Sequence, residues 1–199
     1  MLRLLKEYFP VEVAEKLRGD IQMENIPLDD KKSYQLLCNL DVSGIFQMDN
    51  GKISKPVLKK IQPKNLDEVC AVTALIRPGS GQVEPYIAAK NDNRKRILID
   101  PRIDRFLDKT YGIALYQEQI MSILSTMLHI SFGEADQLRR YIEKSKKYPE
   151  QYKEFIDTFV EISVKNGFSA DAAKYTQQMI IDSSGYGFNS SLVIYNFYI

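Results

Sequence analysis

The sequence predicts a mainly α-helical protein with little strand. Along most of the chain, apolar residues recur three and four positions apart, as they do on one face of a helix. The breaks between these segments fall at glycine, at proline, or at residues such as Asp and Ser that cap helices. With 199 residues, of which 44% are hydrophobic, the chain can bury one sizeable core or two small lobes.

Charge and residue usage exclude several classes of protein. The formal net charge of +1 is too small for the whole chain to bind a polyanion, so any nucleic-acid role must rest on local charge. Cys38 and Cys70 have no histidine at metal-ligand spacing and are expected to be reduced core thiols. His129, the only histidine, offers no Ser-His-Asp or Cys-His nucleophilic site and is expected to end a helix.

Nothing in the sequence predicts a membrane segment. No window of about 18 residues is wholly apolar, and the N-terminus lacks the basic-then-apolar pattern of a signal peptide. We therefore expect a soluble, cytoplasmic protein with no membrane partner.

The first half of the chain is predicted to be a series of short helices. Helices are expected over residues 2–18 (in two pieces), 31–38, 52–61 and 66–75, followed by a connecting loop over 77–81. Asp29 or Asp30 is expected to cap the helix that follows, and a metal site at this pair is the weaker alternative.

Residues 90–105 form the most charge-dense part of the chain, where six basic residues lie among Asp92, Asp100 and Asp104. Two interpretations stay open: a solvated loop, or a patch that contacts a phosphate backbone. Asp100 precedes a proline and is expected to lie in a loop, whereas Asp104 is expected to cap a helix.

A helix is predicted to begin after Tyr116, because Ile120, Leu124 and Met127 belong to a continuous apolar stripe. Gln117 and Gln119 fall off that stripe and are expected to face a ligand or a neighbouring domain.

Ser131 and Glu134 have the spacing of a capping box and predict the start of the next helix. On that helix Arg140, Lys144 and Lys147 share the face opposite the apolar stripe, and Arg139 borders the stripe. Basic residues outnumber acidic ones between 139 and 147, so this face is either a phosphate-binding surface or a merely solvated one.

A helical hairpin is predicted over residues 150–166 and 170–183, with a break at Asn166 and Gly167 and a cap at Ser169. It leads into a turn in which aromatic residues alternate with glycines. Such a turn suits either stacking on a flat base or inward packing of its rings.

Six ordered motifs resemble the fingers region of bacterial C-family replicative DNA polymerases, the DNA polymerase III α subunit. They are PLDD (27–30), SGIFQ (43–47), ALIRPG (74–79), YGIALYQEQIM (111–121), SFGEADQLRR (131–140) and SGYGFN (184–189). The resemblance implies a multi-helical fingers domain over residues 25–189, preceded by a helical lead-in at 1–24 and followed by an unrelated apolar tail at 190–199.

The resemblance also implies site residues. Arg139 and Arg140 are expected to contact the triphosphate of the incoming dNTP, and Lys144 to contact it more weakly. The expected lining of the same active-site region comprises Arg77, Tyr116, Gln117, Glu118, Gln119, Gly185, Tyr186, Gly187, Phe188 and Asn189.

Two departures from the family pattern limit the implied site. The family continues the last motif with a lysine, a serine and a histidine, whereas this chain has Ser190, Ser191 and Leu192. After the paired arginines the family has an Ala-Met-Gly step, whereas this chain has Tyr141, Ile142 and Glu143, and the glutamate should weaken anion binding.

We expect no catalytic residue, metal site or cofactor in this chain. Nucleotidyl transfer needs two divalent metals held by clustered carboxylates, which in this family lie on the palm. The expected partners are the DNA primer–template, the dNTP, and the palm and thumb of the same polymerase, with Mg²⁺ bound outside this chain and the sliding clamp met only through other regions.

The favoured hypothesis is a fingers fragment of a split or interrupted polymerase gene, inactive alone. The alternative is a stand-alone, non-catalytic helical module that binds DNA or regulates a polymerase, and an unrelated small helical enzyme is a weaker third option. The tail from Leu192 to Ile199 has high β-propensity and no charge, so deleting 190–199 is expected to improve solubility.

Overall fold

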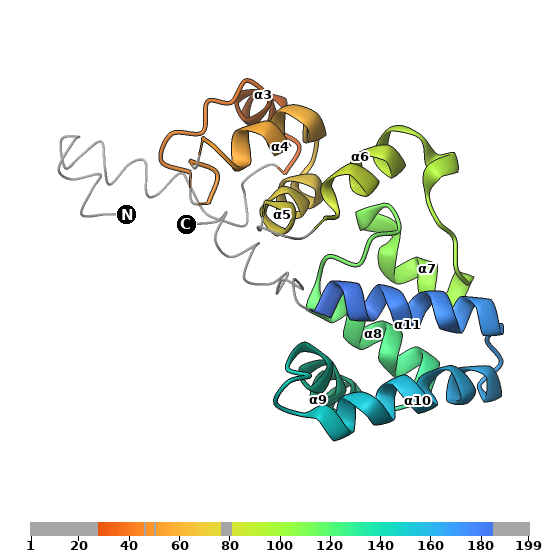
Figure 1. Ribbon diagram of the computed structural model, residues 1–199. Coiled ribbons are helices and arrows are strands. Elements are labelled where there is room, and N and C mark those ends of the chain that lie inside the picture. The colour runs from red at the N-terminus through yellow and green to blue at the C-terminus, as the bar shows by residue number, and fades with distance from the viewer. Residues whose placement is uncertain (1–27, 46, 50, 77–80, 185–199) are drawn as a thin grey trace, which may run out of the picture.

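The computed structural model describes residues 28–45, 47–49, 51–76 and 81–184 (Figure 1). Over these residues it contains nine α-helices and no strand, which confirms the mainly α class. The helices are α3 (Lys31–Cys38), α4 (Ser54–Ile61), α5 (Leu66–Leu75), α6 (Val83–Asn91), α7 (Pro101–Leu107), α8 (Gln117–Leu128), α9 (Phe132–Glu143), α10 (Pro149–Lys165) and α11 (Ala170–Ser184), with short 3₁₀ turns η2 (Asn93–Lys95) and η3 (Asp108–Thr110).

The helices form two lobes, each around its own hydrophobic core (Figure 1). Helices α3 to α6 make up the N-terminal lobe, whose core includes Leu58, Leu75 and the fully buried Tyr86. Helices α7 to α11 make up the C-terminal lobe, whose core includes Leu124 and Phe159. Of the two arrangements that the composition allows, the described chain adopts the pair of small cores.

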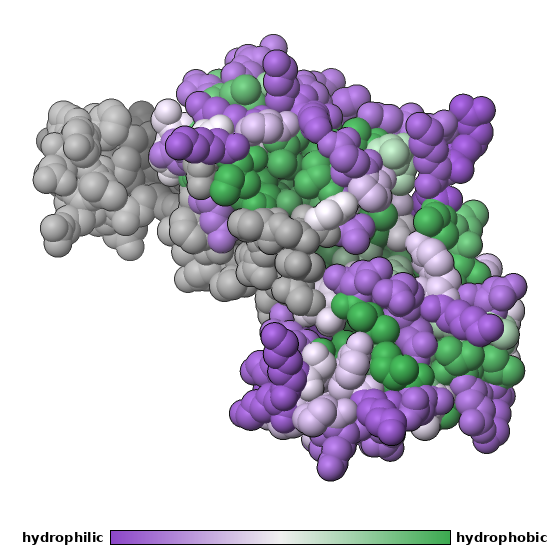
Figure 2. Space-filling model, viewed as in Figure 1, coloured by the Kyte–Doolittle hydropathy of each residue, from purple (hydrophilic) through white to green (hydrophobic). Residues whose placement is uncertain are grey.

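Hydrophilic side chains cover much of the outer surface of both lobes, as Figure 2 shows for one face. Hydrophobic side chains are visible on this face mainly between the helices and along the N-terminal lobe. None of the helices in the described ranges is long and apolar enough to cross a membrane.

Three predicted helix caps are confirmed. The Asp30 carboxylate accepts hydrogen bonds from the backbone N–H groups of Lys32 and Ser33 at the start of α3. The capping box of α9 is complete, since Ser131 and Glu134 each accept from the other's backbone N–H. At α11, the Ser169 hydroxyl accepts from the N–H of Ala172 at 3.1 Å.

Of two expectations for residues 90–105, one is incomplete and one is wrong. Asp100 lies outside the helix, as expected, but it is also the N-cap of α7 and accepts from the N–H of Arg102 at 2.9 Å. Pro101 explains this cap, because proline is favoured at the first helical position and leaves the preceding residue as N-cap. Asp104, expected to be a cap, lies inside α7 and accepts from the N–H of Ile99 at 2.9 Å.

The two lobes meet at the segment over residues 110–116, which links η3 to α8. Within this segment the adjacent residues Ala114 and Leu115 are both buried, but Ala114 belongs to the core of the C-terminal lobe and Leu115 to that of the N-terminal lobe. Gly112 has a φ of +88°, and an added Cβ would lie 3.2 Å from the carbonyl oxygen of Ile97. This close approach and the left-handed backbone explain why glycine occupies the position.

A buried ionic group also ties this segment to the N-terminal lobe. The Glu68 carboxylate accepts from Lys90 Nζ at 2.9 Å and from the Tyr111 hydroxyl at 2.6 Å. Lys90 also donates to the carbonyl oxygens of Ile61 and Gln62, which otherwise lack helical partners at the end of α4. Lys90 is therefore part of the architecture, not of a solvated loop.

Candidate functional site

Parts of several helices lie on the same side of the C-terminal lobe. Helices α8 and α9 pack against each other and are joined by the short link from His129 to Ser131. In Figure 1 the start of α8, helix α9 and the end of α11 lie on the same side of the lobe. His129 ends α8 with a φ of +55° and is exposed, as expected of a helix-end residue.

The paired arginines of α9 differ sharply in their surroundings. The Arg139 side chain is 8% exposed, and its guanidinium lies between Asp136 (2.9 Å) and Glu143 (2.8 Å). The Arg140 side chain is 62% exposed and contacts only Asp136, through Nε at 3.0 Å and Nη2 at 2.7 Å. Arg140 is therefore the arginine that a ligand can reach, whereas Arg139 anchors the helix.

The basic residues that follow the arginines are exposed. Lys144 is the C-cap of α9, and Lys146 and Lys147 lie in the turn after it. Within the part of the chain that the structure describes, these three lysines form no ion pair. Because the carbonyl end of a helix carries partial negative charge, an anion here must be held by side chains and not by the backbone.

In the charge-dense segment over residues 90–105, in contrast, most of the basic side chains are paired with carboxylates. Arg94 pairs with Asp92, Arg96 with Asp108, and Arg102 with Asp100. With Lys90 buried against Glu68, the segment keeps few cations for a phosphate backbone. The structure thus favours the run of lysines after α9 over this segment as an anion-binding surface.

The prediction that Gln119 faces a ligand or another domain is wrong. Its side-chain carbonyl accepts from the N–H groups of Leu115 and Tyr116, both at 2.9 Å. Its amide donates to the Phe106 carbonyl at 3.0 Å and to the Thr110 hydroxyl at 2.8 Å. Gln119 is buried and fully used in shaping the segment over 110–116.

The rest of the predicted cluster lies at the start of α8. Tyr116 is the N-cap and is half-buried, and burial raises the pKa of its hydroxyl. Gln117 and Glu118 are half-buried in the first turn of the same helix. The signal that could have predicted the buried position of Gln119 is its place three residues after the N-cap, which is where a capping box has a glutamine or glutamate. The pattern is hard to recognise here because the N-cap is a tyrosine, not a serine or threonine.

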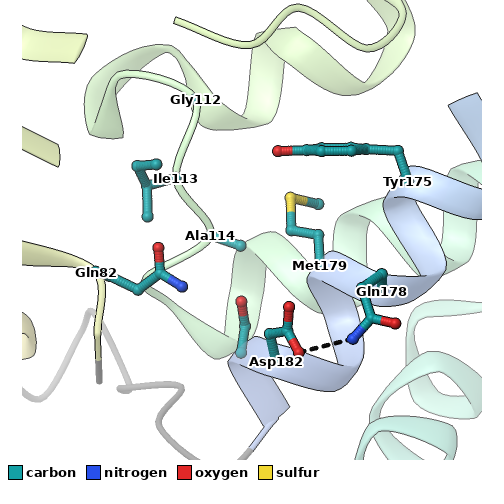
Figure 3. A pocket seen from close by; sticks show the side chains of 9 residues that line it. Gln82, Gly112, Ile113, Ala114, Tyr175, Gln178, Met179 and Asp182 are labelled. Carbon is teal, nitrogen blue, oxygen red and sulfur yellow. Dashed lines mark hydrogen bonds between the residues drawn. The ribbon is translucent and has the colours of Figure 1, made fainter. Parts of the chain in front are cut away.

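A cavity of about 120 Å³ lies between α11 and the segment over 112–114 (Figure 3). Tyr175 and Met179 project from α11 toward Gly112 and Ala114, and Gln82 lies across from them at the start of α6 (Figure 3). Asp182 accepts from the Gln178 amide at 2.8 Å beside the cavity. The volume is below the range of about 300 to 1,000 Å³ typical of pockets for small organic ligands.

Three of the sequence motifs lie at or next to residues that line this cavity. Gln82 follows the ALIRPG motif closely, Ala114 lies within YGIALYQEQIM, and Ser183 directly precedes SGYGFN. Sequence reasoning missed Tyr175 and Met179, although their spacing of four residues places them on one face of the helix.

Some expected site residues lie outside the described residues. These are Arg77, Gly185, Tyr186, Gly187, Phe188 and Asn189, together with the lead-in over 1–24 and the tail over 190–199. Among the residues that are described, no group of three or more His, Cys, Asp or Glu side chains is placed to hold a metal ion.

Residues 1–167 match the family of the bacterial DNA polymerase III alpha subunit finger domain. The chain is 37% identical over 179 residues to the DNA polymerase III subunit alpha of Staphylococcus aureus strain Mu50, which covers 89% of this chain and 16% of that protein. It is 36% identical over 188 residues to the protein of the same name from Halalkalibacterium halodurans, which covers 94% of this chain and 17% of that protein. The chain thus spans less than a fifth of the length of these relatives.

Proposed function

The chain belongs to the family of bacterial DNA polymerase III alpha subunit finger domains, and from this we propose that it serves DNA replication by contacting the incoming dNTP and the primer–template. Within a complete DNA-directed DNA polymerase, it would hold the triphosphate while palm and thumb domains supply the remaining contacts. We also propose a cytoplasmic location, since the relatives are bacterial polymerase subunits.

The observation that carries the proposal is the exposure of Arg140 beside Lys144 at the end of α9. A guanidinium has five N–H donors, and Arg140 directs only Nε and Nη2 to Asp136. The remaining donors suit phosphate oxygens, which arginine binds through two parallel hydrogen bonds. We assign the main triphosphate contact to Arg140, a weaker one to Lys144, and the orientation of the helix to Arg139.

Other residues would complete the lining of the active-site region. Tyr116, Gln117 and Glu118 lie at the start of α8, on the side of the lobe where α9 lies in Figure 1. We propose that Arg77 and the turn over 185–189 join them, because Arg77 lies five residues before Gln82, and the turn follows α11, whose Ser183 lines the same cavity beside α11 as Gln82 does.

The described carboxylates do not fit the two-metal site of nucleotidyl transfer. Asp100 caps α7, Asp104 accepts a hydrogen bond from the N–H of Ile99, and Asp136 forms ion pairs with two arginines. We propose that the magnesium ligands of the complete enzyme lie on the palm and that this chain alone does not extend a primer.

A chimeric polymerase tests the triphosphate contact. Residues 25–189 of this chain would replace the matching segment of the Staphylococcus aureus relative, and primer extension would be measured at varied dNTP concentration. Arg140→Gln is expected to lower kcat/KM for dNTP by about tenfold to a hundredfold, as for the loss of a hydrogen bond to a charged group.

Arg94→Gln is the matched control, because Arg94 is exposed and also pairs with a single aspartate. It should leave the kinetics unchanged. Equal kcat/KM for the Arg140 variant and the unmodified chimera would rule out the proposed contact.

A second candidate function is that of a non-catalytic module that binds DNA directly or occupies the fingers position of a polymerase. The exposed lysines at 144, 146 and 147 favour it, since they are cations that the described chain does not pair. This candidate requires salt-sensitive DNA binding by the isolated chain, which the first function does not.

A further inference from the structure

We propose that Asp136 is an internal counter-ion that a polyphosphate must displace from Arg140, so that it determines which anions this surface accepts. The inference rests on the proposed function, because it takes Arg140 as the triphosphate contact. Asp136 would touch no ligand itself but would set how strongly Arg140 binds one.

The geometry of the carboxylate carries this inference. Asp136 uses a different oxygen for each arginine of α9. Oδ1 accepts from Nε of Arg139 at 3.2 Å and from Nη2 at 2.9 Å, while Oδ2 accepts from Nε of Arg140 at 3.0 Å and from Nη2 at 2.7 Å. Each guanidinium therefore presents its Nε–Nη2 edge, an edge that also matches two phosphate oxygens.

Arg140 is the partner that can leave. Its side chain is largely exposed, so its removal from Asp136 exposes no buried charge. Asp136 remains compensated when Arg140 leaves, because buried Arg139 stays bound through the other oxygen. Arg139 in turn keeps Glu143 as a second partner. The exchange thus leaves every buried charge paired, which avoids the large cost of an uncompensated one.

The exchange favours ligands of high charge. Hydrogen bonds from both arginines, that from Arg140 first, hold the pKa of Asp136 below its usual range, so the carboxylate is an anion at neutral pH. An incoming anion must therefore bind Arg140 more strongly than the Asp136 carboxylate does. A polyphosphate can do so by contacting Arg140 and Lys144 together, whereas orthophosphate competes poorly.

Titration of the full chain with inorganic tripolyphosphate and with orthophosphate, followed by NMR, tests the inference. Asp136→Asn is expected to tighten tripolyphosphate binding about twofold to fivefold, which is the range for removal of an exposed competing ion pair. It should tighten orthophosphate binding by a larger factor and so reduce the preference for the polyphosphate.

Glu143→Gln is the matched control. It removes one negative charge from the same helix but leaves the contact between Asp136 and Arg140 intact. Tighter binding by the Asp136 variant than by both the control and the wild type supports the inference. Equal gains in both variants would show an effect of net charge alone and would overturn it, as would weaker binding by the Asp136 variant.

A measurement on the wild type avoids any loss of folding in the variants. Tripolyphosphate should shift the Nε–H resonance of Arg140, assigned with Arg140→Lys, and leave that of Arg139 in place. Movement of both signals, or of neither, contradicts the displacement. If Arg140→Gln binds tripolyphosphate as the wild type does, the proposed triphosphate contact itself fails; if it loses binding while the two carboxylate variants behave alike, only the role of Asp136 fails.

Discussion

Lys90 forms one of the buried ion pairs on which the fold depends. Its side chain is 10% exposed and that of its partner Glu68 is 5% exposed, so both charges are removed from water and compensate each other. Lys90→Met is expected to lower the free energy of unfolding by about 3 to 5 kcal/mol, because the glutamate is left buried and unpaired. Urea denaturation followed by circular dichroism measures the loss.

Lys60→Met provides the matched control for Lys90. Lys60 also pairs with a glutamate, but the two side chains are 54% and 70% exposed. Loss of this pair should cost about 1 kcal/mol or less, since solvent screens exposed ion pairs. Comparable losses in the two variants would mean that the buried pair does not stabilise the junction between the lobes.

The same pair makes stability depend on acid pH. Burial alone raises the pKa of Glu68, but hydrogen bonds from Lys90 and Tyr111 outweigh it and hold the pKa below its usual value. A carboxyl with a lowered folded pKa stabilises the fold above its unfolded pKa and loses that contribution as the pH falls through the folded pKa. The difference in unfolding free energy between wild type and Glu68→Gln should therefore shrink between about pH 5 and pH 3. A constant difference over this range would contradict the assignment.

At the scale of single residues, the sequence predicted local roles better than long-range ones. The caps at Asp30, Ser131 and Ser169 depend on groups within three residues, and all three are confirmed. The inward role of Gln119 depends on Phe106 and Thr110, and the pairing of Lys90 on Glu68, which are distant in sequence. The spacing of residues along the sequence does not predict such long-range contacts.

Among the elements, α9 is the helix whose start is specified most clearly. Ser131→Ala removes the hydroxyl that accepts from the Glu134 N–H and the partner of its carboxylate. The expected cost is about 1 kcal/mol, typical of an N-cap serine. Thermal unfolding measures it as a lower Tm. Ser122→Ala within α8 is the control and should cost nothing, because the Ser122 hydroxyl only bonds back to the carbonyl of Glu118 and alanine favours the helix.

The ends of two helices were predictable, whereas one helix was missed. The expected ranges 31–38 and 66–75 agree with α3 and α5 at both ends. Helix α6 was not predicted, because Pro85 lies in its first turn and proline usually marks a break in a helical pattern.

For the whole molecule, the order of motifs was predictable but their meeting place was not. The family match identifies the chain as a finger domain, and the structure adds that three motifs lie at or next to residues that line one cavity between the lobes. Ala114 and Leu115 enter different cores although they are neighbours in sequence. The composition allowed two lobes but held no information on where they join. The expected domain bounds of 25–189 stay a prediction.

The distribution of charge over the whole molecule leads to a test of DNA binding. With a net charge of +1, affinity for DNA must come from a surface where cations remain unpaired, and within the described ranges the lysines after α9 form one such surface. Lys146→Gln combined with Lys147→Gln should weaken binding of primer–template DNA and lower the salt slope by about 0.7 to 0.9 for each lost phosphate contact. Fluorescence anisotropy at varied salt measures both quantities.

Arg94→Gln combined with Lys95→Gln removes the same charge from the N-terminal lobe, where Asp92 already neutralises Arg94. This control should leave the salt slope unchanged. If both double variants lose the same affinity, DNA responds to the total charge of the molecule and not to a surface beside Arg140. If only the first loses affinity, the cations that would hold the triphosphate and those that would hold the DNA backbone are continuous. The end of α9 would then serve both of the proposed ligands.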